Sequence, residues 1–184
     1  AEHAKSPAVL EDLLEDVRHM NLVILNAGIL GGLKDLRDTS LSELKLVMDL
    51  NVWANKMIID ALMVDQRRVD QVVAVSSGAA FNGSGGWGGY SISKSALNLM
   101  IRVYADEHPD THFATLAPGI VLTDMVQEVL DTRDDPRWPA VARIRQARDE
   151  SQIREPAEAA RVFLDAVPRL LSTESGSFSD VRKM

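Results

Sequence analysis

The chain has 184 residues, of which 46% are hydrophobic and 26% are charged, a composition that fits one globular domain and excludes a disordered or fibrous protein. The formal net charge of −7 argues against a nucleic-acid partner, because phosphate binding depends on clustered Lys and Arg side chains. The absence of cysteine excludes disulfides and thiolate zinc sites, and it favours the reducing cytoplasm.

The first predicted elements are a short helix and a strand. Ser6-Pro7 supplies an N-cap and a residue suited to the first helical position, and apolar residues follow at helical spacing as far as Val17. Residues 22–25 are continuously apolar and end at Asn26-Ala27-Gly28, which is typical of a strand buried on both faces. No segment has the apolar length of a membrane span or the core of a signal peptide, so we expect no membrane partner.

The middle of the chain predicts a long helix and a second strand followed by a helix. A capping box at Ser40-x-x-Glu43 begins an apolar-rich pattern without Gly or Pro, which indicates a helix over residues 41–63. Residues 72–75 have the β-branched character of a buried strand. A Gly-rich loop and a mostly apolar helix over residues 91–107 follow.

The last third of the chain adds two strands, a helix and a charged segment. The strands are expected at residues 113–117 and 177–181, and the helix begins at Pro156. Residues 131–155 are charged and contain two prolines, with a short helix expected at residues 141–146. They form either an insertion that covers a substrate site or a plain surface loop.

This alternation predicts one α/β domain over residues 1–184, with a Rossmann-like, doubly wound parallel sheet between two helix layers. Ligands of such sheets bind beyond the carboxyl ends of the strands. Three of the predicted strands end in small or polar residues that would meet at one crevice, namely Asn26-Ala27-Gly28, Ser76-Ser77-Gly78 and Pro118-Gly119. Any one of these motifs alone is what an ordinary turn uses.

The pair Tyr90-x-x-x-Lys94 indicates the chemistry. Residues four apart share a helix face, so the ammonium can lie beside the phenol. A phenol has a pKa near ~10, whereas a general acid works best near ambient pH, and a neighbouring cation lowers the phenol pKa towards that range. As a bare pattern the pair is weak, and the alternative is a surface contact on an ordinary helix.

Together with this pair, four further motifs resemble the short-chain dehydrogenase/reductase family in identity, order and spacing. They are Asn26-Ala27-Gly28 after a strand, Asn51 inside a long helix, Ser77 thirteen residues before Tyr90, and Pro118-Gly119-x-x-x-Thr123. Gly86-Trp87 and residues 117–125 look most similar to the sepiapterin and benzil reductase branch. The resemblance covers residues 21–181, and it implies a nicotinamide-dependent oxidoreductase that reduces a carbonyl or oxidises an alcohol.

The resemblance also implies catalytic roles. Tyr90 would exchange a proton with the carbonyl oxygen, Ser77 would hydrogen-bond that oxygen, and Lys94 would lower the pKa of Tyr90 and hold the nicotinamide ribose. Asn51 would anchor a water that relays protons from the lysine to solvent. Without the other motifs, Asn51 would be interpreted as a helical Asn satisfied by solvent, and Ser77 as a cap at a strand end.

Further residues would contact the cofactor or the substrate. Those expected to flank the nicotinamide are Pro118, Gly119, Val121 and Thr123, and those expected near the adenosine are Asn26, Ala27 and Gly28. Ordinary strand exits and a tight turn are the alternatives for these two groups. Gly78 and Trp87 would join Ser77 and Tyr90 in the substrate pocket.

One part of the family pattern has no match. The family begins with a strand, a Thr-Gly-x-x-x-Gly-x-Gly loop and a helix that bind pyrophosphate, but the first glycine here is Gly28. We therefore expect the first strands of the sheet to be absent from this sequence, which makes residues 22–25 an edge strand. Residues 83–88 spell Gly-x-Gly-x-x-Gly, but five residues separate them from Ser77, so we interpret them as a wall of the substrate pocket.

This resemblance predicts a short-chain dehydrogenase/reductase that uses NADP(H) or NAD(H), and the similarity to the reductase branch favours NADP(H). The expected substrate is a small carbonyl compound or alcohol. The helices at residues 41–63 and 91–107 are apolar over more than one face, which indicates a homodimer or homotetramer. His108 and His112 are four apart, but Pro109 disrupts a shared helix face, so we predict no metal site. The alternative function is a fragment or pseudoenzyme that binds no cofactor and acts through protein contacts.

Overall fold

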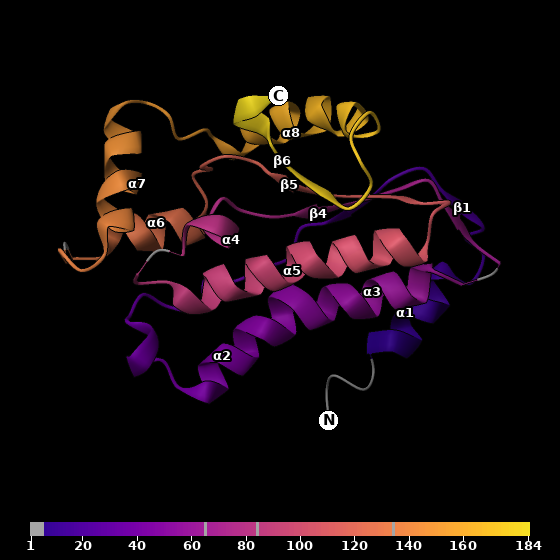
Figure 1. The fold of residues 1–184 in the computed structure, drawn as a ribbon, viewed down its shortest axis with the longest axis horizontal. Coiled ribbons are helices and arrows are strands. Elements are labelled where there is room, and N and C mark those ends of the chain that lie inside the picture. The colour runs from indigo at the N-terminus through magenta and orange to yellow at the C-terminus, as the bar shows by residue number, and fades with distance from the viewer. Residues whose placement is uncertain (1–5, 65, 84, 134) are drawn as a thin grey trace.

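The computed structural model of the protein describes residues 6–64, 66–83, 85–133 and 135–184. Within these ranges a four-stranded parallel sheet has the order β2-β4-β5-β6, and helices cover both of its faces (Figure 1). The strands are β1 (His19–Met20), β2 (Val23–Leu25), β3 (Arg68–Val69), β4 (Gln71–Val75), β5 (His112–Ala117) and β6 (Ser177–Asp180). The α-helices are α1 (Ser6–Leu14), α2 (Leu41–Met48), α3 (Ala54–Leu62), α4 (Ala79–Asn82), α5 (Gly88–Glu107), α6 (Asp124–Asp131), α7 (Pro139–Asp149) and α8 (Pro156–Leu170).

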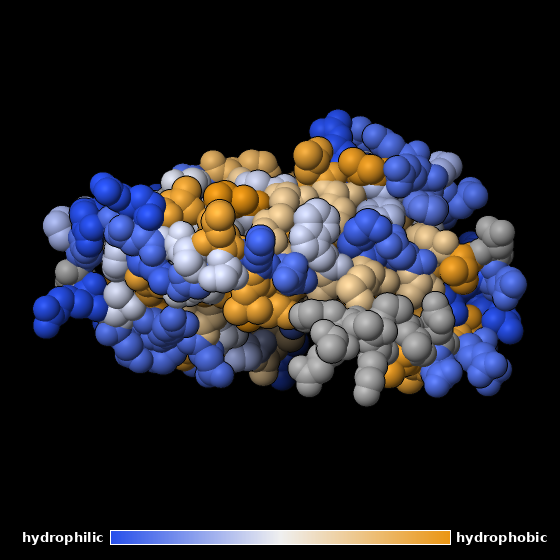
Figure 2. Space-filling view, turned by 90° about the horizontal axis from the view of Figure 1, so that it is seen from below, coloured by the Kyte–Doolittle hydropathy of each residue, from blue (hydrophilic) through white to orange (hydrophobic). Residues whose placement is uncertain are grey.

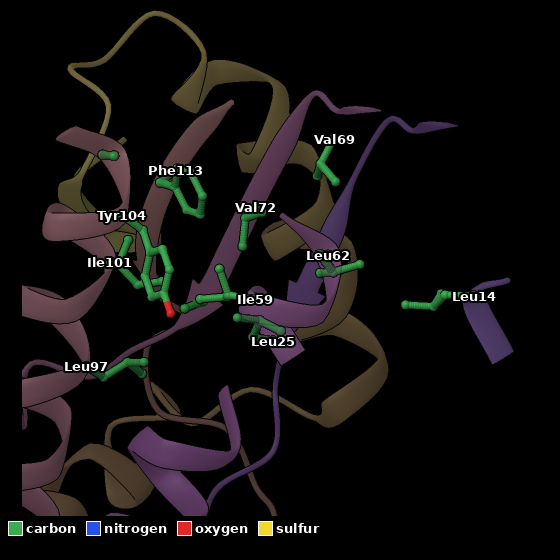
Figure 3. Packing of buried hydrophobic residues seen from close by; sticks show 12 residues of the cluster. Leu14, Leu25, Ile59, Leu62, Val69, Val72, Leu97, Ile101, Tyr104 and Phe113 are labelled. Atoms are coloured by element: carbon green, nitrogen blue, oxygen red, sulfur yellow. The ribbon is translucent and has the colours of Figure 1, made fainter. Parts of the chain in front are cut away.

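Alternate side chains of β4 and β5 belong to two hydrophobic cores, because successive residues of a strand point to opposite faces of the sheet. Val72 and Phe113 pack with residues of α3 and α5, and Figure 3 shows this cluster. Val73 and Leu116 pack on the other face, against α8. Both central strands are therefore buried on both sides, and the predicted α/β fold with a parallel sheet between two helix layers is confirmed.

Strand β2 forms one edge of the sheet. Among the described residues it pairs with β4 on one side only, which confirms the edge position predicted for residues 22–25. The predicted burial on both faces is wrong. Leu25 is 4% exposed but Ile24 is 38% exposed, because the side chain of Ile24 faces the cavity described below.

A continuous helix runs from α2 through a π-helical turn at Asp49–Trp53 into α3, in agreement with the helix predicted over residues 41–63. The predicted capping box is present, since Ser40 and Glu43 exchange both hydrogen bonds. The π-turn was not predicted. It contains Asn51, whose carbonyl accepts a hydrogen bond from Asn55 Nδ2 at 2.8 Å, and such turns are frequent at functional sites.

The segment that links β5 to α8 is more helical than predicted. Helix α6 was not expected, and α7 covers Pro139–Asp149 rather than residues 141–146 alone. Pro139 suits the first helical turn, and Ala140, Val141 and Ala147 are buried, so packing extends the helix beyond its local pattern. Among the helices of the described ranges, none combines the length and apolarity needed to cross a membrane.

Candidate active site

A cavity of about 790 Å³ lies at the carboxyl ends of β2, β4 and β5. The predicted strand exits therefore do converge. Of the predicted site residues, those that line the cavity are Asn26, Gly28, Ser77, Trp87, Tyr90, Lys94, Pro118, Gly119, Val121 and Thr123. Three predicted residues do not line it: Ala27 is exposed to solvent, Gly78 lies beside Asn82 and Arg182, and Asn51 is fully buried behind the wall.

The phenol of Tyr90 and the hydroxyl of Ser77 meet in this cavity. Tyr90 lies in the first turn of α5, and Ser77 lies two residues after the end of β4. Burial raises the pKa of Tyr90 above its usual value near 10, and a side-chain hydrogen bond with Ser77 lowers it in part. The Ser77 oxygen also accepts from the backbone N–H of Ala79 at 3.1 Å, so its orientation is fixed by the turn that follows the strand.

Lys94 lies one helical turn beyond Tyr90 and is 4% exposed. Its ammonium donates to the carbonyl of Val75 at 2.8 Å and lies 5.8 Å from the centroid of the Tyr90 ring. Burial lowers the pKa of Lys94 from 10.5 to about 8, because the charged form loses its hydration. The two groups thus share a helix face, as the spacing predicted, although Lys94 is not among the causes that shift the pKa of Tyr90.

Asn51 joins the loop after β2 to helix α5. Its Oδ1 accepts from the N–H of Ile29 at 2.8 Å, and its Nδ2 donates to the Ile29 carbonyl and to Ser93 Oγ, each at 2.9 Å. With 0% exposure, Asn51 is not a helical Asn satisfied by solvent. The amide fixes the loop that forms one wall of the cavity.

Two glycines allow close approach to the polar centre of the site. A Cβ at Gly28 would lie 3.2 Å from Asn51 Oδ1 and 3.4 Å from Lys94 Nζ. Gly119 has φ +81, a conformation that side chains rarely adopt, and a Cβ there would lie 3.3 Å from Arg154 Nη1. Larger residues at these positions would fill the space between the strand ends.

Gly85 and Gly86, in the glycine-rich segment between α4 and α5, pack against Trp138. Trp138 Nε1 donates to Asp35 Oδ1 at 2.7 Å, and Arg137 forms an ion pair with the same carboxylate. A Cβ at Gly86 would lie 2.9 Å from Cγ of Trp138. Of the predicted pocket wall, only Trp87 lines the cavity among the described residues, whereas Gly85 and Gly86 do not line it and instead leave room for the indole of Trp138.

Gly86→Ala is expected to lower the free energy of unfolding by about 2 kcal/mol, because the new Cβ would meet the indole at a φ of +95. Gly83→Ala is the matched control: its φ is +51 and nothing lies within 4 Å of the added Cβ, so only the backbone cost of about 1 kcal/mol applies. Denaturant unfolding of both variants measures the difference. Equal losses would show that the Trp138 contact is unimportant.

Several residues of the site carry no recognisable signal in the sequence. Ser93, Asn98 and Asp35 act through hydrogen bonds to partners far away in the chain. An apolar group beside Tyr90 comes from the 30–33 loop, α6 and α7, and its members are Leu30, Leu33, Met125, Val129, Val141 and Ile144. Only the packing of α6 and α7 against the strand ends identifies them.

Comparison with known proteins tests the predicted family. The model of the short chain dehydrogenase family matches residues 1–134. The chain belongs to this family. The family predicted from the motifs is thereby confirmed.

Individual relatives point to the predicted branch. The benzil reductase ((S)-benzoin forming) of Bacillus subtilis is 26% identical over 168 residues, which are 88% of this chain and 68% of the relative. The sepiapterin reductase of Bos taurus is 32% identical over 123 residues, which are 62% of this chain and 45% of the relative. The chain spans about half the length of some curated relatives, as for an uncharacterized oxidoreductase of Schizosaccharomyces pombe, of which it covers 48%.

Solved structures share the fold. The crystal structure of the KRED1-Pglu enzyme has a TM-score of 0.81 at 22% identity, and the match covers 94% of this chain and 75% of that enzyme. A short chain dehydrogenase from Escherichia coli CFT073 complexed with NADPH has a TM-score of 0.71 at 22% identity, with 97% of this chain and 70% of the other covered.

Proposed function

We propose that the protein reduces a carbonyl compound with a nicotinamide cofactor, or oxidises the corresponding alcohol, with Tyr90 as the proton donor or acceptor. One observation carries this proposal: the phenol of Tyr90, the hydroxyl of Ser77 and the ammonium of Lys94 lie on one wall of a cavity at the strand ends. Proton transfer needs a donor within hydrogen-bond reach of the substrate oxygen. Both Tyr90 and Ser77 line the cavity, so a substrate there can reach their hydroxyl groups.

Each of these residues has a distinct task. Tyr90 gives its proton to the carbonyl oxygen as that carbon is reduced, and burial keeps the phenol protonated at neutral pH because it raises the pKa. Ser77 donates to the same oxygen and orients it. Lys94, the cation beside the Tyr90 ring, stabilises negative charge that develops on the phenolate. Asn51 keeps the loop at Ile29 in place and, as the family pattern implies, anchors a water near Lys94.

The residues at the strand ends fit a nicotinamide nucleoside. The Lys94 ammonium has three donors, of which one is used by the Val75 carbonyl, so ribose hydroxyls can accept the others. Gly28 and Gly119 leave the backbone accessible, and Pro118, Val121 and Thr123 offer the wall against which a flat ring can lie. A bound nicotinamide supplies the hydride, while the protein supplies position and electrostatics.

NADP(H) is the proposed cofactor, in preference to NAD(H). Two neighbours with the same fold were solved as complexes with NADPH and NADP, and the relatives of the predicted branch are reductases by name. A chain without cysteine suits the reducing cytoplasm, which is where we propose that the enzyme works.

The proposed substrate is an uncharged ketone or vicinal dicarbonyl with an aromatic or other apolar group. The part of the cavity beside Tyr90 is lined by Leu30, Trp87, Met125, Val129 and Ile144. Asp124 also lines the cavity, and its carboxylate disfavours an acidic substrate. Because Ile144 belongs to α7, we propose that the segment over residues 131–155 covers the substrate.

Steady-state assays with NADPH and NADH test this function. We expect NADPH oxidation with benzil, and at least tenfold lower kcat/KM for phenylglyoxylate, a control that keeps one phenyl ring and its ketone but carries a carboxylate in place of the second benzoyl group. An absence of turnover and of cofactor binding would favour the alternative, a protein that acts through contacts with other proteins. A preference for phenylglyoxylate would reject the apolar substrate class.

We also propose that the protein is a homodimer or homotetramer. Apolar side chains on the outer faces of the α2–α3 helix and α5 are exposed, among them Trp53 (48%), Leu99 (65%) and Val103 (46%). Figure 2, which views the molecule from the side of these helices, shows apolar side chains between hydrophilic ones. An exposed apolar face of this kind is suited to a second copy of the chain, and sedimentation velocity measures the assembly.

A further inference from the structure

Helix α5 is fastened to the chain segment that carries Ser77 by hydrogen bonds on both sides of that residue. Before it, Lys94 Nζ donates to the Val75 carbonyl at 2.8 Å, and Ser76 Oγ donates to Asn98 Oδ1 at 2.6 Å. After it, Ser95 Oγ donates to the Ala80 carbonyl at 2.5 Å. The position of Ser77 relative to Tyr90 therefore depends on contacts that neither residue makes itself.

The contact between Ser76 and Asn98 is the one nearest to Ser77. Ser76 is 2% exposed, and its N–H donates to the Leu116 carbonyl at 2.9 Å, which continues the pairing of β4 with β5. The hydroxyl of Ser76 is thus held by α5, and both Ser76 and the next residue along the chain, Ser77, line the cavity. The side chain of Asn98 forms this hydrogen bond through Oδ1. Its Nδ2 is buried and has no hydrogen-bond partner among the described residues.

Tyr90, Lys94 and Asn98 follow one another at intervals of four residues, so they lie along one face of α5. We propose that Asn98 is a positioning residue, which holds Ser76 and thereby fixes the hydroxyl of Ser77 beside the phenol of Tyr90. This inference rests on the proposed function. Asn98 does not line the cavity, so it acts through Ser76 and not on the substrate.

The test begins with Asn98→Leu, which keeps the size of the side chain and removes the acceptor. We expect kcat to fall about tenfold, because a displacement of Ser77 by a fraction of an ångström weakens the orientation of the reacting oxygen. The KM for the cofactor should stay within twofold of that of the wild-type protein, since Lys94 and the residues that follow β2 and β5 are unchanged. A normal kcat in a folded variant would overturn the proposal.

Gln71→Met is the matched control. Gln71 lies at the opposite end of β4 and donates through Nε2 to the Val167 carbonyl of α8 at 3.3 Å, so it also joins this strand to a helix by a buried side-chain bond. We expect both variants to lose thermal stability and only Asn98→Leu to lose kcat. Equal losses of kcat in the two variants would mean that Asn98 has a structural role alone.

Two further variants separate positioning from packing. Asn98→Asp supplies an oxygen in the same place and should keep kcat within about threefold of the wild-type value, measured at the plateau of the pH profile. Ser76→Ala should match Asn98→Leu, and the double variant should be no slower than either, because the two residues act through one contact. If the fold losses of kcat in the two single variants multiplied in the double variant, the proposal would be contradicted.

A titration that needs no turnover separates this inference from the proposed function. The chain has two tyrosines, so in a Tyr104→Phe background the ultraviolet absorbance of phenolate reports Tyr90. The hydrogen bond with Ser77 lowers the pKa of Tyr90, so Asn98→Leu should raise that pKa and Gln71→Met should not. An inactive wild-type protein would reject the proposed function, whereas an unshifted titration in Asn98→Leu would reject the role of Asn98.

Discussion

Tyr90→Phe is expected to lower kcat about 10³-fold while the protein stays folded, because a positioned general acid contributes ~10²- to 10⁴-fold to the rate. Among the described residues the phenol forms a side-chain hydrogen bond with Ser77 alone, and the ring itself, which packs with the apolar residues around Leu30, is retained. Steady-state kinetics with NADPH and benzil, together with a thermal melt, measure both effects.

Tyr104→Phe is the control for this variant. Tyr104 lies on the same helix, and its hydroxyl donates to Asp60 far from the cavity. This part-buried hydrogen bond to a charged group contributes about 1.5 kcal/mol to stability, and we expect kcat to be unchanged. If Tyr90→Phe kept more than a tenth of the wild-type turnover, Tyr90 would not be the proton donor.

Lys94→Met is expected to lower kcat/KM at least 10²-fold and yet to stabilise the protein. Burial lowers the pKa of Lys94 from 10.5 to about 8, so at pH 7 the folded protein carries a buried ammonium at a cost of about 3 kcal/mol relative to water. Methionine removes that cost. It also leaves the Val75 carbonyl without its donor, which lowers the free energy of unfolding by about 1 to 2 kcal/mol. A net gain of about 1 to 2 kcal/mol should remain.

The pH dependence of stability shows whether the buried charge of Lys94 is the cause of this stability difference. Between pH 8 and 10.5 the unfolded chain still holds the proton that folded Lys94 has released, so the free energy of unfolding of the wild-type protein rises with pH in this window. The difference between the wild-type protein and Lys94→Met should therefore shrink as pH rises. A constant difference, or a variant less stable than the wild-type protein at pH 7, would contradict this explanation.

Lys56→Met controls for the loss of a lysine as such. Lys56 lies on α3, is half exposed and pairs with Asp60 at 2.6 Å, so its removal should change stability by less than about 1 kcal/mol. We expect no change in kcat/KM. The contrast between the two lysines reflects burial, because only Lys94 gives up the hydration of its charge on folding.

Local sequence patterns were sufficient where a residue's role depends on its neighbours in the chain. The capping box at Ser40 and Glu43, the strand over β4 and the shared face of Tyr90 and Lys94 all follow from spacing along one element. The convergence of the strand exits was also predictable, because parallel strands end at one edge of a sheet. These features predicted the α/β fold and the place of the cavity, whereas the family was predicted from the resemblance of five motifs taken together.

Only the tertiary structure decided the contacts between segments far apart in the chain. Trp138 packs against Gly86 and hydrogen-bonds to Asp35, Asn51 hydrogen-bonds to the loop at Ile29, and Asn98 accepts a hydrogen bond from Ser76. None of these pairs has a spacing that a periodic pattern can reveal. The pKa values belong to this class as well, since desolvation depends on everything packed around Tyr90 and Lys94. Periodicity specifies which face of an element is buried, whereas the partner that buries it is chosen by the packing of the whole sheet and its helices.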